Sequence, residues 1–299
     1  MRILVMQEVS PAGLAELEGH ELVHGENPAG FDAAVCYLID RIDEPFLATP
    51  GLRALATVSV GLDHIDLAAA ERYGIPISYT PDVLTEATAD LTFALLLASA
   101  RRLNEAERYL RDGRWTEWSF DLLLGTEVHG KTLGIVGPGR IGRAVARRAD
   151  GFGMRVLYAG RERSELERVL RESDFVAITV PLSAATRHLI GADELAMMKP
   201  GAILVNSSRG PVVDEAALAA SLQSGHLGGA GLDVFENEPT VNPELLKCEN
   251  AVLVPHIGSA TRETRDGMAR LACRGLAQIL RGERPPNLAN PQVWKQPVG

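Results

Sequence analysis

The glycine pattern Gly137-x-Gly139-x-x-Gly142 constrains the fold of this chain more than any other feature. It follows the apolar run TLGIVG (132–137), and the amphipathic segment RIGRAVARRA begins inside it. In a strand, loop and helix of this kind, the first glycine allows a tight turn and the second admits a pyrophosphate. The third lets the helix pack closely on the strand. The pattern therefore predicts a dinucleotide-binding loop.

The helix after this loop, expected at 141–150, supplies the donors for the phosphates. Backbone N–H groups at a helix N-terminus point toward a bound anion, and here they belong to Arg140 and Ile141. Pro138 has no N–H group and fixes its own φ near about −65°. The neighbouring amides must then hold the pyrophosphate.

Apolar runs alternate with helical segments along the whole chain. The runs expected as strands are 1–6, 33–38, 52–60, 75–80, 132–137, 155–159, 175–181, 202–208, 229–235 and 251–258, and further helices are expected at 164–172, 213–224 and 261–281. This alternation predicts βαβ units and parallel sheets. The expected fold is α/β with two open parallel-sheet domains: a flavodoxin-like substrate domain over 1–98 and a Rossmann dinucleotide-binding domain over 99–283. The segment 284–299 is expected to pack back on the first domain.

A helix that is apolar on nearly every side is expected from Thr85 through Ala100. Such a helix is buried, either inside the subunit or against a second copy of the chain. It is therefore a candidate connector between the domains and a candidate oligomer face.

The composition narrows the range of partners. A net charge of −9 does not suit a protein that binds nucleic acid, and the most apolar run, 91–100, is half the length of about 20 residues that a membrane span needs. The three cysteines are odd in number and lack CxxC spacing, which fits a reducing compartment and no metal site. We expect a cytoplasmic protein that binds small molecules, with no nucleic acid, membrane or metal partner.

Charged and titratable residues follow three predicted strands of the second domain. Arg209 lies in VNSSRGPVVDE, Asp233 and Glu238 lie in GLDVFENEP, and His256 lies in VPHIGSAT. Ligands of open α/β sheets bind beyond the carboxyl ends of the strands. An arginine fork can clamp a carboxylate, and a histidine beside a carboxylate can carry a proton near neutral pH. The set suits reduction of a 2-oxo acid, with hydride delivered to C2 and His256 protonating the oxygen.

Each of these residues also has a structural interpretation. Taken alone, Arg209 fits a surface ion pair, Glu238 an ordinary loop acid and His256 a structural hydrogen bond. Only their combination favours catalysis.

These stretches together resemble the D-isomer-specific 2-hydroxyacid dehydrogenases. The matching motifs are VGLDHIDL (60–67), TEATADLTFALLLASARR (85–102), HGKTLGIVGPGRIG (129–142), MKPGAILVNSSRGPVVDEAAL (198–218), GAGLDVFENEP (229–239) and PHIGSATRETR (255–265). The resemblance covers nearly the whole chain. Within the family, YLIDRID (37–43), GRWTEW and LLLGTEVHG look most like the glyoxylate/hydroxypyruvate reductase branch.

The resemblance implies a role for each matching residue. Arg209 would bind the substrate, and His256, paired with Glu238, would act as the acid/base. The backbone N–H groups of Val60 and Gly61 would receive the substrate carboxylate. Asp233 and Ser259 would lie near the nicotinamide, and the chain would form a homodimer through its nucleotide-binding domain.

Two features depart from the family pattern. Pro138 replaces the usual aliphatic or small residue in the glycine loop, and the segment from Arg161 to Asp174 is shorter than in the family. The shortened segment has room for one helix but not for the usual extra strand and helix. We therefore expect the second sheet to lack an edge strand.

The same segment bears on the choice of cofactor. An NAD enzyme of this fold carries an acid about 20 residues after the first glycine to hold a ribose, but 157–161 reads Leu-Tyr-Ala-Gly-Arg. Arg161 and Arg163, with Ser164 as a further donor, can instead pair with a 2′-phosphate. NADP is the expected cofactor, with NAD as the alternative.

The main hypothesis is thus an NADP-dependent reductase of glyoxylate or hydroxypyruvate. A second hypothesis is an NAD-dependent dehydrogenase of another 2-hydroxy acid, such as 3-phosphoglycerate. A third is a non-catalytic nucleotide-sensing protein, because a fold does not fix a function. The catalytic set disfavours the third, since a sensor needs no acid/base pair.

Overall fold

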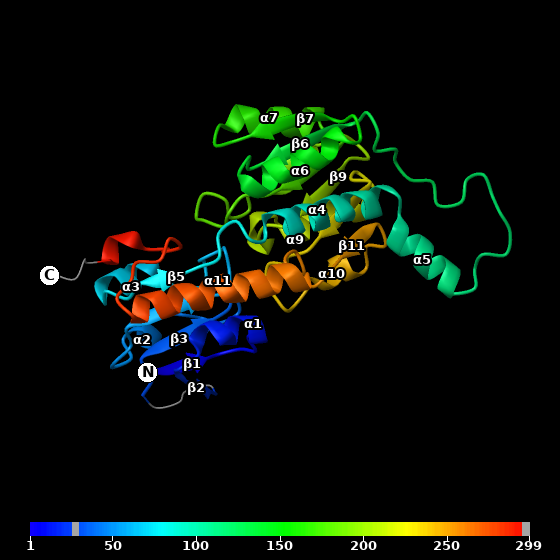
Figure 1. Cartoon of the computed structure of the whole chain (residues 1–299). Helices are drawn as coiled ribbons and strands as arrows, with labels where there is room; N and C mark the ends of the chain where they lie inside the picture. Colours follow the sequence, from blue (N-terminus) through cyan, green and yellow to red (C-terminus); the bar gives the residue numbers. More distant parts are fainter. Residues whose placement is uncertain (26–29, 295–299) are drawn as a thin grey trace. The chain divides into compact units, whose positions relative to one another are not determined.

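The computed structural model describes residues 1–25 and 30–294, and the chain divides into two compact units (Figure 1). Unit 1 comprises Met1–Leu84 with Ser259–Gly299, and unit 2 comprises Thr85–Gly258. Each unit contains one parallel sheet, with five strands in unit 1 and six in unit 2. The predicted fold class, two open parallel-sheet α/β domains, is confirmed.

Unit 1 is a flavodoxin-like domain. Its elements are β1 (Arg2–Val5), α1 (Pro11–Leu14), η1 (Ala15–Leu17), β2 (Glu21–His24), β3 (Ala33–Cys36), α2 (Glu44–Leu47), β4 (Ala54–Thr57), α3 (Leu67–Arg72), β5 (Ile77–Ser78), α11 (Arg262–Leu280) and η3 (Pro291–Val293). The strand order β2-β1-β3-β4-β5 is the flavodoxin-like order. Alternate strand residues face opposite layers: Ile3 and Val5 pack in the cluster that contains α11 residues, whereas Leu4 packs with residues of α2 and α3. Both faces of the sheet are therefore covered, as is usual for parallel sheets.

The chain after α11 returns to β5 within unit 1. Asn290 accepts a hydrogen bond from the Ile77 amide at 2.9 Å and donates to the Ile75 carbonyl at 2.8 Å. Asn287 donates to the Tyr79 carbonyl at 2.7 Å. Part of the segment expected to pack on the first domain, 295–299, lies outside the described residues.

Unit 2 is a Rossmann-type domain. Its elements are α4 (Thr85–Ala100), α5 (Leu103–Arg111), β6 (Thr132–Val136), α6 (Arg140–Asp150), β7 (Arg155–Ala159), α7 (Arg163–Glu172), β8 (Phe175–Ile178), α8 (Ala192–Met197), β9 (Ile203–Asn206), η2 (Gly210–Val212), α9 (Glu215–Gln223), β10 (Gly229–Leu232), α10 (Pro243–Leu246) and β11 (Ala251–Leu253). The strand order is β11-β10-β9-β8-β6-β7. The order reverses beside β6, which pairs with β7 on one side and β8 on the other. Ligands of doubly wound sheets bind at such a switch point.

The shortened segment folds as predicted. A single helix, α7, connects β7 to β8, and β7 forms the edge of the sheet. Among the residues that the structure describes, no strand pairs with β7 other than β6, as the shortened segment predicted.

The division into units differs from the boundaries expected from the sequence. The expected boundary at 98/99 falls inside α4, which packs on β9, β10 and α6 in unit 2. Gly231 of β10 allows this, because a Cβ there would lie 2.9 Å from Cβ of Leu95. Helix α11, expected in the second domain, belongs to unit 1 and packs on β4 and β5. None of the helices in the described ranges has the length and apolar character of a membrane span.

Candidate active site

The glycine loop lies at the switch point, and two of its glycines are required by close packing. Gly137 has a φ of +95°, and a Cβ there would lie 2.9 Å from the Val180 amide nitrogen. A Cβ on Gly142 would lie 2.5 Å from the Gly137 carbonyl oxygen and 2.8 Å from Oγ1 of Thr179. The Thr179 hydroxyl also donates to that carbonyl at 2.7 Å. The loop is thus fixed against the ends of β6 and β8.

Gly139 differs from the other two glycines because no described atom lies within 4 Å of where its Cβ would be. It is the N-cap residue of α6, so the space beside it opens at the N-terminus of an 11-residue helix. Positive helix-end amides beside open space fit a pyrophosphate. Pro138 contributes its carbonyl, which accepts a hydrogen bond from Nε of Arg143 at 3.0 Å.

The end of β7 carries both basic and acidic groups. Arg161, Arg163 and Ser164 are exposed there, and Arg163 is paired with Glu194 at 2.7 Å and Glu167 at 3.2 Å. The hydrogen bonds that Arg163 donates, first the one to Glu194 and then the one to Glu167, raise the pKa of Arg163. Arg161 forms no ion pair with any residue in the described ranges. Arg161 is therefore the more available cation of the two.

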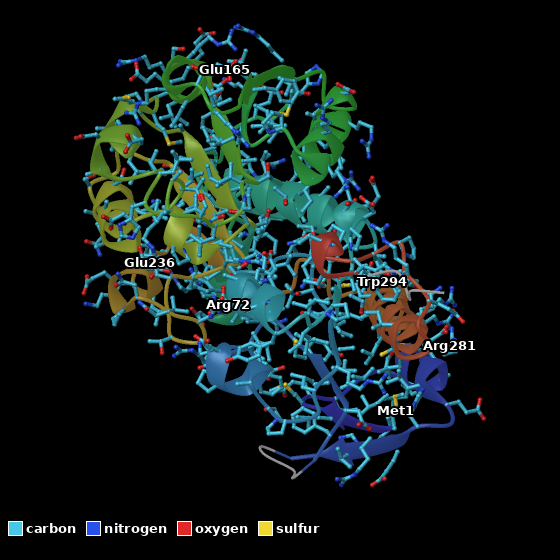
Figure 2. The ribbon with its side chains drawn as sticks, turned by 90° about the vertical axis from the view of Figure 1, so that its left-hand side faces the viewer. Met1, Arg72, Glu165, Glu236, Arg281 and Trp294 are labelled. Atoms are coloured by element: carbon cyan, nitrogen blue, oxygen red, sulfur yellow. The ribbon has the colours of Figure 1, made fainter. Side chains whose placement is uncertain are left out.

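The sequence reasoning missed the carboxylate of Glu165, which is labelled in Figure 2. One of its oxygens accepts a hydrogen bond from the Gly160 amide at 2.8 Å, directly after β7. Positions 157–161 contain no acid, as expected, but the carboxylate of Glu165 lies beside their end. Glu165 lies five residues further along the chain and reaches back from the first turn of α7.

Arg209, Glu238 and His256 come together within unit 2, at the carboxyl side of the strands. Nδ1 of His256 and one carboxylate oxygen of Glu238 are 2.7 Å apart, and the other oxygen accepts the Phe235 amide at 3.0 Å. Burial alone would raise the pKa of Glu238, but the hydrogen bond from His256 and the charges of His256 and Arg209 bring it below its usual value. The side chains of Glu238 and His256 are 28% and 24% exposed, so the pair remains accessible to a ligand.

The backbone of His256 has a left-handed φ of +51°, which Asp233 holds in place. The carboxylate of Asp233 accepts the Ile257 amide at 2.6 Å and the Gly258 amide at 2.8 Å. A left-handed conformation costs a non-glycine residue about 1 to 2 kcal/mol, and these two bonds offset it. Burial raises the pKa of Asp233. Asp233 thus orients the histidine loop.

Arg209 follows β9 in a turn that packs directly on the loop after β10. Its carbonyl accepts a hydrogen bond from Nδ2 of Asn206 at 3.0 Å, and its Nη1 donates to the Ser208 carbonyl at 2.8 Å. The next residue, Gly210, allows the contact, because a Cβ there would lie 1.8 Å from the carbonyl carbon of Phe235. The turn of Arg209 and the loop of Glu238 are therefore one packed assembly.

The remaining predicted residues belong to unit 1. Val60 and Gly61 follow β4, and neither of their amides donates to another described residue. Ser59 donates to the Gly61 carbonyl at 2.8 Å. Ser259 begins the second segment of unit 1. In the described ranges, no group of three or more His, Cys, Asp or Glu residues is placed to hold a metal.

The comparisons with known proteins agree with this geometry. The family model for the D-isomer specific 2-hydroxyacid dehydrogenase, NAD binding domain, matches residues 93–258. The glyoxylate reductase of Korarchaeum cryptofilum is 49% identical over 323 aligned positions, covering 98% of this chain and 97% of that protein.

Two solved structures have the same fold along the whole chain. The TT0316 protein of Thermus thermophilus has a TM-score of 0.91 at 45% identity, covering 97% of this chain and 100% of that one. An NADPH-dependent glyoxylate/hydroxypyruvate reductase of Sinorhizobium meliloti, in complex with NADP and malonate, has a TM-score of 0.86 at 38% identity and covers 95% of each chain.

A Rossmann-type unit with a glycine loop and a histidine–carboxylate pair defines an oxidoreductase that uses a nicotinamide dinucleotide. The chain belongs to the D-isomer specific 2-hydroxyacid dehydrogenase family. It is an NAD(P)-dependent enzyme that interconverts small 2-oxo and 2-hydroxy acids.

Proposed function

We propose that this enzyme reduces glyoxylate or hydroxypyruvate to the corresponding 2-hydroxy acid, with NADPH as the preferred cofactor. The observation that carries the proposal is the assembly of Arg209, Glu238 and His256 in unit 2. The names of the relatives support the choice of substrates, since both a glyoxylate reductase and a glyoxylate/hydroxypyruvate reductase are among them.

The residues divide the reaction between them. Arg209 would hold the substrate carboxylate with charge-assisted hydrogen bonds. A nicotinamide dinucleotide held at the glycine loop would supply the hydride that adds to C2 of the oxo acid. The imidazolium of His256 gives its proton from Nε2 to the carbonyl oxygen, because Nδ1 is engaged by Glu238. The substrate thus gains one hydride and one proton.

The preference for NADPH would depend chiefly on Arg161. This arginine is exposed at the edge of the sheet, whereas Arg163 is already paired with two glutamates. Glu165 works in the opposite direction, because its carboxylate would repel a 2′-phosphate. We therefore propose that the preference for NADPH over NADH is set by two opposing effects on the 2′-phosphate: attraction by Arg161 and repulsion by Glu165.

We also propose that the enzyme forms a homodimer through unit 2. The contacting surface would be the arm 103–127, which comprises α5 and the loop after it. Within unit 2, the arm extends away from the sheet and its flanking helices (Figure 1). Its exposed apolar side chains include Trp118, 77% exposed, and Phe120, 81% exposed. Such a surface is typical of a protein interface.

An assay of the purified protein with NADPH and either oxo acid tests the main proposal. We expect turnover with glyoxylate and hydroxypyruvate, and a loss of about 100- to 10,000-fold in kcat for His256→Ala. Arg209→Lys should raise KM, because an ammonium cannot form the two parallel bonds of a guanidinium. An absence of turnover with a panel of small 2-oxo acids, or an active His256→Ala variant, would refute the proposal.

A further inference from the structure

Glu215 is a buried carboxylate with no direct part in the proposed reaction. It is the first residue of α9 and is 6% exposed. The helix does not need it as a cap, since Asp214 accepts the Ala217 amide at 2.9 Å. Burial raises the pKa of Glu215, and the nearby charges of Glu236 and Glu238 act in the same direction. A carboxylate in such surroundings is costly unless its hydrogen bonds serve another purpose.

Those hydrogen bonds hold both ends of one loop, the segment 236–242. The Glu215 carboxylate accepts the Glu236 amide at 2.6 Å, and the backbone amide of Asn242 also hydrogen-bonds it. In return, the Glu236 carboxylate accepts the Glu215 amide at 3.2 Å and contacts Nε2 of His188 at 2.7 Å. Glu236 is labelled in Figure 2. Glu215 thus holds the loop at both ends, through the backbone amides of Glu236 and Asn242.

The 236–242 loop carries Glu238, the partner of His256. The loop has other anchors among the described residues. The Thr240 amide bonds to the Asn237 carbonyl at 2.8 Å within the loop, Val241 packs against the core of unit 2, and Asn242 caps α10. The Phe235 amide bonds to Glu238 at 3.0 Å. Glu215 binds both ends of the loop, so the position of the Glu238 carboxylate, 2.7 Å from Nδ1 of His256, depends in part on Glu215.

We propose that Glu215 is a positioning residue, which fixes the 236–242 loop so that Glu238 stays on Nδ1 of His256. It does not touch the reacting atoms and acts through the loop backbone. The proposal rests on the acid/base role proposed for His256.

A set of three variants separates positioning from simple structural support. Glu215→Ala removes both acceptors, and Glu215→Gln keeps one acceptor oxygen for the Glu236 amide. Asp174→Asn is the matched control, because Asp174 also accepts a backbone amide, that of Thr132 at 2.9 Å, but at the start of β6. Glu215→Ala should lower kcat about 10- to 100-fold with KM for glyoxylate changed by less than about threefold. Glu215→Gln should restore most of the loss, and Asp174→Asn should lower thermal stability without lowering kcat.

A second measurement follows the His256 ring itself by NMR in the protein without cofactor. In Glu215→Ala the ring signals should move from their wild-type positions, because the Glu238 carboxylate no longer stays on Nδ1. Asp174→Asn should leave the ring signals at their wild-type positions. Unchanged ring signals in Glu215→Ala, or an equal change in Asp174→Asn, would overturn the proposal.

The experiments also distinguish a Glu215→Ala variant that does not fold from a failure of the acid/base role proposed for His256. If Glu215→Ala does not fold, Glu215→Gln carries the test: a smaller change in the His256 ring signals is expected, and no change overturns the proposal. Wild-type activity and the His256→Ala variant are measured first. Activity that survives in His256→Ala contradicts the acid/base role, whatever the Glu215 variants do.

Discussion

At the scale of single residues, carboxylates that bind backbone amides position the reacting groups. Asp233 holds the amides beside His256, Glu238 accepts the Phe235 amide, and Glu215 accepts the Glu236 amide. Each hydrogen bond to a charged group contributes about 1.5 to 3 kcal/mol. A backbone amide also leaves little rotational freedom to the group it binds. The geometry of the site is therefore fixed mainly by hydrogen bonds between carboxylates and loop backbone amides, and less by ion pairs between long, flexible side chains.

The lowered pKa of Glu238 predicts a pH-dependent contribution to stability. Its pKa in the folded protein lies below the unfolded value of about 4.3, so the contribution is present above that value. It is lost as pH falls through the lower, folded pKa. The difference in unfolding free energy between the wild type and Glu238→Gln should therefore be present at pH 7 and shrink on acidification. Urea unfolding at pH 7, 5, 4 and 3 measures it, and a difference that grows toward acid pH would contradict the assignment.

Cofactor preference is predicted to depend on Arg161 and Glu165 in opposite directions. Arg161→Ala should lower the ratio of kcat/KM for NADPH to that for NADH by about fivefold, since one exposed charge pair contributes about 1 kcal/mol. Glu165→Gln should raise the ratio, because it removes the repulsion of the 2′-phosphate. Arg171→Ala is the control, because Arg171 lies in the last turn of α7, the helix that carries Glu165 in its first turn. A ratio that Arg161→Ala leaves unchanged would rule out the proposed contact.

At the scale of elements, glycines in the loop between β6 and α6 serve two different purposes. Gly139 leaves open space at the helix N-terminus, whereas Gly142 allows close packing. Gly139→Ala should leave the unfolding free energy within about 1 kcal/mol, because its φ of −74° suits alanine and its Cβ direction is open. It should weaken dinucleotide binding about tenfold or more, since the methyl group occupies the open space. Gly142→Ala should instead destabilise the fold by about 1 to 3 kcal/mol. Urea unfolding and calorimetric titration with NADPH distinguish the two, and equal stability losses would contradict this interpretation.

Most of the helices predicted after the glycine loop follow from the sequence, and the exceptions have physical causes. The helices predicted at 141–150, 164–172, 213–224 and 261–281 match α6, α7, α9 and α11 to within two residues at each end. Their apolar periodicity and caps specify them locally. Periodicity does not say which sheet a helix covers, so α11 was expected in the wrong unit. Helix α4 is apolar on nearly every side, and its sequence did not indicate its packing partner.

The candidate site was predictable to a similar degree. Arg209, Glu238 and His256 follow apolar runs, and parallel strands end at the same edge of a sheet, so their proximity could be inferred. Glu165 could not be found in this way. Its contact with the Gly160 amide depends on the direction in which α7 leaves β7, which the local sequence does not specify. Glu215 was hidden for a similar reason, as its partners lie 21 residues away in a different loop.

At the scale of the whole molecule, the arm 103–127 predicts the oligomeric state. We expect a dimer in light scattering, and a monomer for the double variant Trp118→Ser and Phe120→Ser, because these side chains are 77% and 81% exposed. Leu246→Ser, at another exposed apolar position in α10, should remain dimeric. A wild-type monomer would contradict the proposed interface.

The division of unit 1 into two segments has a consequence for how the protein is made. Unit 2 is continuous from Thr85 to Gly258, so all of it has been synthesised before α11 leaves the ribosome. Ile3, Val5 and Ala33 pack in the cluster that α11 completes, and this face of the sheet must wait for residues near the end of translation. Domains generally fold as units in the order in which they are synthesised. Here the part of the chain that emerges first completes its fold last.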